Sequence, residues 1–370
     1  MSQPIPTTMK AVILPSAGER LTLRTVPVPT VVPGSALIKV LSTAVDGHGP
    51  ALLSGKIFTF PDNFTPGCRT VGRVAATGPD TTSLTHGQLV MIEPFFRGRD
   101  DPNVQILWGA FDGPSPASKK FMAQNWALGG YAEYTLAPLE NVHVLDEEVL
   151  CGQLGYSVHD LLQLSVQLVA YGGLRSIGLQ AGETVIVAPA TGSFSGAAVH
   201  VAVAMGAKVI AMGRKKEVLE EFQRVHGESR VKIVVPTGDV EADTAALKKF
   251  GEVDAYIDIS PAQASTSTHI RSCFLAVKPY GRVSLMGVVT NDLAVPYSYL
   301  VWNSLTVKGL YMYERADVTG LIKLAESGVL KLGEGAAMTV LGTFGLEDIE
   351  KALELAASDT RAGRVVAITP

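Results

Sequence analysis

The sequence predicts an α/β protein built from two domains, and two observations carry this prediction. In the first part of the chain, short apolar segments are separated by Gly and Pro, which is typical of an all-β unit. From about Glu147, apolar segments alternate with longer amphipathic ones, which is typical of a doubly wound parallel sheet. With 370 residues, the chain is long enough for two such domains.

The β-rich domain is predicted over residues 1–155. Its strands are residues 9–14, 35–45, 73–78, 88–94 and 129–138. Residues 95–126 form a long polar segment, which we interpret as an excursion over an active site or an interface. A last apolar segment, residues 363–369, is predicted to return to this domain, which residues 312–370 therefore complete.

The second domain is predicted over residues 156–311, where apolar strands are separated by helix-like segments. The strands are residues 184–190, 208–213, 231–235, 253–260, 282–287 and 305–312. Amphipathic segments such as residues 215–227 lie between them. This repeated alternation of strand and helix predicts the parallel sheet.

Composition and charge exclude several classes of protein. The formal net charge of −4 argues against nucleic acid as a partner, and no basic block indicates an anionic membrane surface. The three cysteines lie far apart and make neither a disulfide framework nor a CxxC metal site. The N-terminus lacks the apolar core of a secretory signal, and no run of about 18 apolar residues exists. We therefore expect a reduced, cytoplasmic protein.

A turn of small residues follows the first strand of the second domain. It comprises Ala190, Thr191, Gly192, Ser193, Phe194 and Ser195, and a helix-like segment comes next. Small residues let the backbone approach a phosphate, and the N–H groups at the start of the helix face that anion. The strand, turn, helix and second strand together predict a dinucleotide site.

The residues after the second strand indicate which dinucleotide binds. An NAD site usually has Asp or Glu there to accept a hydrogen bond from the ribose 2′-OH, whereas this chain has Gly213, Arg214 and Lys215, followed by Lys216. A guanidinium can pair with a 2′-phosphate, which a carboxylate would repel. We therefore predict NADPH as the cofactor. The alternative is that these cations are only the solvated start of a helix.

With this unit placed after a β-rich half, the chain resembles the medium-chain dehydrogenase/reductase superfamily of alcohol dehydrogenases and quinone reductases. The segments that fall in the family's order are residues 9–14, 36–55, 65–78, 129–138, 182–202 and 206–220. The resemblance implies a GroES-like catalytic domain and an inserted Rossmann domain. It also implies that Gly287 and Val288 flank the nicotinamide ring and that Tyr311 lies beside its amide.

The sequence departs from the family at the positions of the zinc ligands. By resemblance, these positions hold Asp46, Cys68 and a residue near Ser165, and Arg69 replaces a glutamate. Zinc needs three firm ligands, and a cation beside it would be repelled, so we expect no metal. Residues 95–126 have the length of the family's structural zinc lobe but contain no Cys. Ser195 stands where the third glycine of the phosphate turn is expected.

Without zinc, a hydrogen-bond donor must stabilise the substrate oxygen that becomes negative during hydride transfer. His48 is the candidate, because in the family its position starts the proton relay and a histidine can deliver a proton near neutral pH. Asp46 could orient His48 or balance Arg69. The alternatives are that His48 is a surface residue and that Cys68 is a buried spacer.

The leading hypothesis is therefore a zinc-independent, NADPH-dependent reductase of a small apolar conjugated enone or carbonyl compound. The alternatives are a zinc-dependent alcohol dehydrogenase with an atypical site, a non-catalytic NADPH-binding protein and a redox-neutral cyclase. Residues 304–313 resemble the family's edge strand that pairs across a two-fold axis, so we expect a homodimer. Phe58, Trp108 and Trp126 are candidates for lining an apolar pocket.

Overall fold

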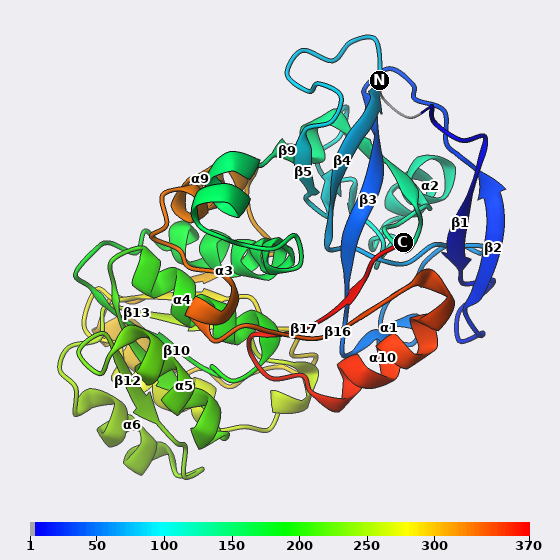
Figure 1. Cartoon of the computed structure of the whole chain (residues 1–370). Helices are drawn as coiled ribbons and strands as arrows, with labels where there is room; N and C mark the ends of the chain where they lie inside the picture. Colours follow the sequence, from blue (N-terminus) through cyan, green and yellow to red (C-terminus); the bar gives the residue numbers. More distant parts are fainter. Residues whose placement is uncertain (1–3) are drawn as a thin grey trace. The chain divides into compact units, whose positions relative to one another are not determined.

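The computed structural model describes residues 4–370 and divides into two compact units (Figure 1). The first unit is β-rich and the second contains a parallel sheet connected by helices, so the predicted α/β fold class is confirmed. The first unit holds the chain up to Ser165 together with Thr339–Thr360 and Arg364–Pro370, and the second holds Val166–Met338 and Arg361–Gly363.

The first unit is organised around strand β3 (Ser35–Val45). This strand pairs with three others, all antiparallel: β4 (Thr70–Thr77), β8 (Tyr134–Pro138) and β17 (Arg364–Ile368). The sheet continues through β5 (Leu89–Ile92) to β9 (Val142–Val144) on one side and through β17 to β16 (Thr339–Phe344) on the other. A separate hairpin joins β1 (Thr8–Ile13) to β2 (Thr22–Pro27).

The end of the chain returns to this first unit, as predicted. Val366 of β17 lies opposite Val45 of β3, at the end of the strand that leads to Asp46. Helix α10 (Ile349–Ser358) lies against β16 and β17, and Ile349, Ala352, Leu353 and Ala356 bury its apolar face (Figure 1). The C-terminal segment therefore supports the strand from which the candidate catalytic residues project.

The polar segment 95–126 is a folded lobe, and its position over an active site or an interface stays a prediction. It forms the hairpin β6 (Phe95–Arg97) and β7 (Gln105–Leu107), helix α2 (Pro116–Phe121) and a π-helical turn (Met122–Trp126). Phe96 stacks on Trp108 with ring centroids 5.6 Å apart and meets Trp126 edge-on. Trp108 is fully buried and donates to the Leu128 carbonyl, so it belongs to the core and not to a substrate pocket. Apolar packing thus holds this lobe together.

The second unit contains a six-stranded parallel sheet. Its order is β12 (Val231–Val234), β11 (Lys208–Met212), β10 (Thr184–Val187), β13 (Ala255–Asp258), β14 (Arg282–Leu285) and β15 (Thr306–Gly309). This is the strand order 3-2-1-4-5-6 of a Rossmann fold, which binds ligands beyond the carboxyl ends of the strands where the order reverses. The reversal lies between β10 and β13.

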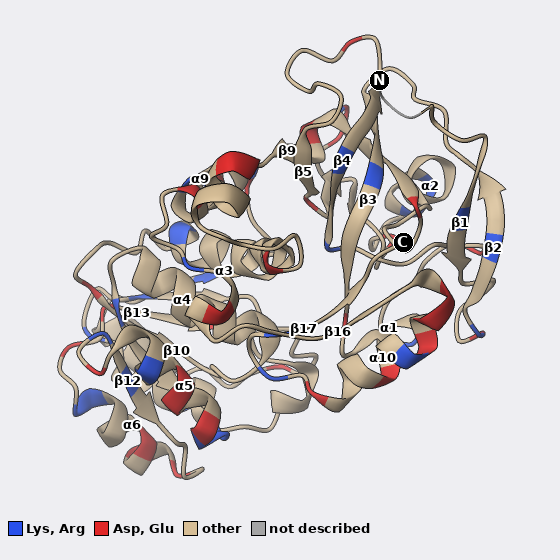
Figure 2. Cartoon of the chain, viewed as in Figure 1, with Lys and Arg blue, Asp and Glu red and all other residues tan. Residues whose placement is uncertain are grey.

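Helices connect the strands of this sheet: α4 (Ser193–Ala204), α5 (Lys216–His226), α6 (Val240–Lys248), α7 (His269–Ala276) and α8 (Tyr297–Trp302). Helix α4 is buried along most of its length, whereas α5 is amphipathic. Val218, Leu219 and Phe222 form the buried face of α5, and the helix also carries charged residues of both signs (Figure 2). The apolar face of α5 therefore packs against the sheet, as the amphipathic sequence pattern predicts.

Residues 312–338 belong to the second unit and not to the first, so the predicted boundary at 311 does not match this division. Helix α9 (Arg315–Glu326) packs on α3 (Leu164–Ser176). Asp317 forms an ion pair with Arg175 at 3.3 Å, and a Cβ on Gly320 would lie 2.7 Å from the Tyr171 hydroxyl. The boundary predicted at 155 also lies earlier in the chain than the observed division after Ser165. Over residues 4–370, no helix has both the length and the apolar character needed to cross a bilayer.

Candidate functional site

The phosphate turn of the second unit lies at the reversal point of the sheet. Strand β10 is buried, the turn follows it, and helix α4 begins at Ser193 with Gly192 as its N-cap. The first N–H groups of a helix have no partner within the helix and attract anions. The predicted residues 190–195 therefore lie where a pyrophosphate would meet the start of α4.

Two glycines at this turn are required by close packing. A Cβ on Gly196 would lie 2.3 Å from the Cβ of Ala362 and 3.0 Å from the Ala190 carbonyl oxygen. A Cβ on Gly213 would lie 2.6 Å from Cγ2 of Thr191. Position 196, one residue after the expected place, thus supplies the glycine that lets α4 approach the strand. The Ser195 hydroxyl contacts the backbone of Gly192 and closes the first turn of α4, so it is engaged within the helix.

The cations predicted to bind a 2′-phosphate lie at the end of β11. Arg214 and Lys215 are exposed, Lys215 is the N-cap of α5, and Lys216 pairs with Glu220 at 3.1 Å. Between residues 4 and 370, no ion pair to Arg214 or Lys215 is found. Cations at the N-terminus of a helix are unfavourable because the helix dipole is positive there. This end of the sheet is therefore suited to bind an anion, and no carboxylate stands in the place that an NAD site requires.

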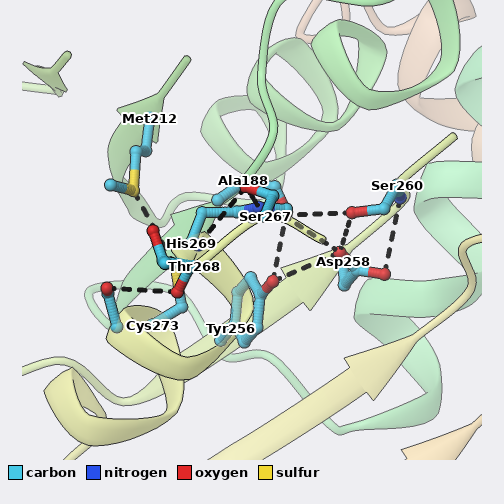
Figure 3. A network of polar contacts seen from close by, with 10 residues as sticks. Ala188, Met212, Tyr256, Asp258, Ser260, Ser267, Thr268, His269 and Cys273 are labelled. Carbon is cyan, nitrogen blue, oxygen red and sulfur yellow. Dashed lines mark hydrogen bonds and ion pairs between the residues drawn. The ribbon is translucent and has the colours of Figure 1, made fainter. Parts of the chain in front are cut away.

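A buried polar network lies beyond the carboxyl end of β13 (Figure 3). Asp258 is 2% exposed, and its Oδ1 accepts hydrogen bonds from the hydroxyls of Ser260 and Tyr256. His269 contacts Ser260 through Nε2 at 3.0 Å and Ser267 through Nδ1 at 2.6 Å. The Tyr256 hydroxyl also lies 3.3 Å from the Ala188 carbonyl oxygen, two residues before the phosphate turn begins. The network therefore ties the loop after β13 to the strand that carries the phosphate turn.

This network also fixes the predicted nicotinamide residues after β14. The Val288 N–H donates to the Ser260 carbonyl at 2.8 Å, and a Cβ on Gly287 would lie 2.7 Å from Oδ2 of Asp258. Only glycine fits at position 287, whereas Val288 is exposed. Tyr311 follows β15 and is half exposed. Sequence reasoning missed the network. The available signal was the polar pair Asp258 and Ser260 at the end of a buried strand.

In the first unit, Asp46 and His48 follow the end of β3. Oδ1 of Asp46 accepts the His48 backbone N–H at 2.8 Å. His48 is exposed and is the N-cap of the short helix α1 (Gly49–Leu53). The Asp46 carboxylate therefore positions the backbone of His48, and no bond to the imidazole ring is found among residues 4–370.

Arg69 lies beside Asp46 and is buried. Its Nη2 is 4.0 Å from Oδ2 of Asp46 and donates to the Val45 carbonyl at 3.2 Å. Burial raises the pKa of the neighbouring Cys68 thiol to about 11, so this thiol is protonated at neutral pH. Burial also raises the pKa of Tyr131, whose hydroxyl donates to the Ala44 carbonyl at 3.4 Å. Asp46, His48 and Cys68 are the sequence candidates in this region, and Asp46 is the one that forms an ion pair with Arg69.

These residues do not fit a zinc ion. Among the side chains of residues 4–370, no group of three His, Cys, Asp or Glu is placed to hold a metal. The third position near Ser165 is buried and uncharged, and the Arg69 guanidinium lies where it would repel a dication. A zinc site needs three ligands of firm donor character, and the neutral hydroxyl of a serine at the third position does not complete such a set with Asp46 and Cys68.

The chain is similar to known dehydrogenases and reductases along most of its length. Residues 32–147 match the family model of the alcohol dehydrogenase GroES-like domain, and residues 195–327 match that of the zinc-binding dehydrogenases. The L-threonine 3-dehydrogenase of Streptomyces avermitilis is 26% identical, and the match covers 97% of this chain and 98% of that protein. An NAD-dependent alcohol dehydrogenase of Sulfurisphaera tokodaii is 23% identical over 97% of this chain and all of its own.

Two further similarities are informative. The acryloyl-coenzyme A reductase of Metallosphaera sedula is 27% identical over 54% of this chain and 55% of its own length. The solved structure of a thermostable alcohol dehydrogenase from Pyrobaculum aerophilum has a TM-score of 0.73 at 22% identity, and the match covers 98% of this chain and all of that one. That likeness shows the fold, in agreement with the two units described above.

Proposed function

We propose that the chain is a member of the medium-chain dehydrogenase/reductase superfamily and that it is a zinc-independent, NADPH-dependent reductase of a small apolar conjugated enone or carbonyl compound. The two matching family models and the relatives support its coarser function, that of an oxidoreductase with a nicotinamide dinucleotide. When bound, the cofactor supplies the hydride. The chain's own residues hold the dinucleotide, select its phosphate and stabilise charge on the substrate oxygen.

The choice of NADPH rests on one observation, the residues that follow β11. Gly213 packs on Thr191, so the chain turns directly beside the phosphate turn and presents Arg214 and Lys215 to solvent. A relative is named as NAD-dependent, but this chain has no acidic side chain at the position that recognises the ribose 2′-OH. Charge-assisted hydrogen bonds to a 2′-phosphate are the interaction that these cations favour.

The choice of a reductive, metal-free reaction rests on the first unit. Its donor set does not fit zinc, so stabilisation of a negative substrate oxygen must come from side chains. Conjugate reduction suits such a site, because the enolate oxygen needs only a hydrogen-bond donor. The similarity to acryloyl-coenzyme A reductase supports a carbon–carbon double bond as the target. His48 is exposed beside Asp46 and is our candidate to deliver the proton.

The experiment that tests this function follows NADPH oxidation with a panel of enones, quinones, aldehydes and imines. We expect turnover with at least one conjugated substrate, a preference for NADPH over NADH, and no loss of rate after treatment with a zinc chelator. Tight NADPH binding without turnover would instead indicate a non-catalytic NADPH-binding protein. Turnover of alcohols that depends on bound zinc would establish the atypical alcohol dehydrogenase.

We also propose that the chain forms a homodimer through the edge of the second sheet. Within residues 4–370, strand β15 pairs with β14 alone, and all of its residues are exposed. Large apolar side chains gather in nearby segments, with Trp302 at 85% exposed, Tyr280 at 79% and Tyr297 also largely exposed. An open, apolar sheet edge favours pairing with another strand. A second copy of β15 would continue the sheet.

A further inference from the structure

The guanidinium of Arg69 is buried, and its ion pair with Asp46, at 4.0 Å, is longer than a hydrogen bond. The residue is 6% exposed, and Nη2 makes one hydrogen bond, to the Val45 carbonyl. Nε is buried and has no hydrogen-bond partner. Fully buried arginines are rare unless they are paired, because removing a charge from water is costly. The structure of residues 4–370 thus leaves much of this cation's bonding capacity unused.

The neighbours of Arg69 explain why its charge is poorly balanced. Asp46 is the nearest carboxylate, but its Oδ2 lies 4.0 Å away, too far for a hydrogen bond, and its Oδ1 is occupied by the His48 N–H. Tyr131 uses its hydroxyl on the Ala44 carbonyl and does not accept from the guanidinium. The guanidinium therefore keeps hydrogen-bonding capacity for an oxygen anion beyond the weak pairing with Asp46.

We propose that Arg69 is the oxyanion-binding group of this protein and donates a hydrogen bond to the substrate oxygen that becomes negative during reduction. This inference rests on the proposed function and names the donor that the function needs. The anion is an oxygen anion in either of two forms, the enolate oxygen formed in the reaction or a carboxylate already present on the substrate. A guanidinium suits both, since it stays charged and offers several donors.

For an enone, the proposed step is a conjugate reduction. When bound, the reduced nicotinamide would supply a hydride, with its electron pair, to the β-carbon and would itself be oxidised. The electron pair of the C=C bond moves to join the α-carbon to the carbonyl carbon, and the C=O electron pair moves onto oxygen. Arg69 stabilises this oxygen and keeps its own proton. A proton from His48 or water then reaches the α-carbon, and the carbonyl re-forms.

The backbone around Arg69 is already fixed for this role. The Ala44 N–H donates to the Arg69 carbonyl at 2.9 Å, and the Thr43 hydroxyl donates to the same carbonyl at 3.1 Å. Nη2 is held by the end of the neighbouring strand. A donor held in place in a water-poor environment stabilises a developing charge strongly, because the surroundings need not reorganise.

The test compares Arg69→Gln and Arg69→Lys with the matched control Arg73→Gln. Arg73 lies four residues along the same segment and pairs with Glu147 on the surface. For Arg69→Gln, we expect kcat to fall about 100- to 1000-fold with an enone, as when an oxyanion donor is removed. Arg69→Lys should retain part of the rate, and Arg73→Gln should match the wild type. Because Arg69 lies outside the dinucleotide unit, the Kd of NADPH should stay unchanged in all three variants.

The outcomes distinguish an enolate oxygen from a preformed carboxylate. They also distinguish failure of the Arg69 inference from failure of the proposed function. A loss in kcat with an unchanged KM assigns Arg69 to the enolate oxygen. A rise in KM confined to carboxylate-bearing substrates assigns it to a preformed carboxylate. Unchanged kcat and KM in Arg69→Gln would overturn the inference while leaving the reductase intact, whereas NADPH binding without wild-type turnover would defeat the proposed function instead. Should Arg69→Gln fold poorly, rescue of Arg69→Ala turnover by added guanidinium provides the same decision, since a structural role would leave the rate unrestored.

Discussion

Two cationic regions of this molecule are built in opposite ways. Arg69 in the first unit is buried and fixed beside β3, whereas Arg214 and Lys215 in the second unit are exposed at the start of α5. Exposed cations are solvated in the empty protein, so they affect ligand choice with little effect on folding. A buried cation with a distant partner lowers the stability of the fold. If the two proposals hold, the exposed region selects a cofactor, and the buried one is maintained for chemistry at a cost in stability.

The largest effect is expected for Arg69→Met, which replaces the buried charge with an apolar side chain of similar length. Turnover should fall about 100-fold or more, because the oxyanion donor is lost. Stability toward urea should be unchanged or higher by about 1 kcal/mol, because a poorly paired buried charge is removed. Enzyme kinetics and urea unfolding of the same preparation measure both quantities. A marked loss of stability with normal turnover would reverse the proposed contrast between the regions.

Replacing the exposed cations Arg214 and Lys215 should change cofactor affinity and leave stability nearly unchanged. In the double variant Arg214→Ser with Lys215→Ser, the Kd of NADPH should rise about 10- to 100-fold, because charge-assisted hydrogen bonds to the 2′-phosphate are lost. The Kd of NADH should change little, and urea stability should stay within about 0.5 kcal/mol of the wild type. Fluorescence titration with each dinucleotide measures the affinities. Equal weakening of both would mean that these cations do not distinguish the two cofactors.

The proposed interface extends the comparison to apolar side chains on the surface of the second unit. Trp302→Asp should weaken a homodimer by about 30-fold or more if this tryptophan is a central contact, because buried aromatic residues dominate such interfaces. Analytical ultracentrifugation over a range of concentrations measures the shift toward monomer. Asp292→Asn, an exposed change in the loop before α8, is a control for altered surface charge. A wild-type protein that is monomeric at all concentrations would contradict the proposed dimer.

A smaller effect concerns two histidines of the second unit, the buried His200 and the half-buried His226. Burial lowers the pKa of His200 to about 3, and burial together with the nearby Lys331 and Arg230 lowers that of His226 to about 4. Nδ1 of His200 contacts Nε2 of His226 at 2.8 Å. Both are thus neutral in the folded chain, whereas a histidine in the unfolded chain takes up a proton below pH of about 6.5.

This histidine pair makes stability depend on pH. The contribution of the neutral pair to the free energy of unfolding should be fully present above about pH 6.5. It should fall as the pH decreases toward 4, by up to about 1.4 kcal/mol per pH unit for each proton bound on unfolding. His226→Gln removes one titrating group and should make this decline less steep, whereas the exposed His86→Gln should not. Urea midpoints between pH 7 and pH 4.5, roughly the window set by these pKa values, measure the slopes. Equal slopes in both variants would show that the pair does not carry the effect.

The sequence predicted the cofactor-binding half well because its signals are local. Apolar strands such as residues 184–187 and 208–212 are short and flanked by small or charged residues, and the phosphate turn lies directly between two such elements. Gly213 and Arg214 could be placed because they follow a strand whose position in the sheet is set by the pattern. The positions of residues that directly follow a strand could therefore be predicted from the sequence.

The remaining features depend on contacts between distant segments. Asp258 and His269 meet only because the loop after β13 folds back, and hydrophobic periodicity gives no sign of this. The aromatic core of segment 95–126 was hidden because Phe96, Trp108 and Trp126 are dispersed among polar residues. The burial of Arg69 was also invisible, since an arginine near a strand usually lies at the surface.

The most direct test of the account is the rate of NADPH oxidation with a conjugated substrate, measured on one preparation before and after exhaustive removal of divalent metals. The account predicts equal rates, because the positive charge near the substrate oxygen comes from Arg69 and the donor set around it does not fit zinc. Loss of the rate on metal removal, with full recovery on adding zinc, would contradict it.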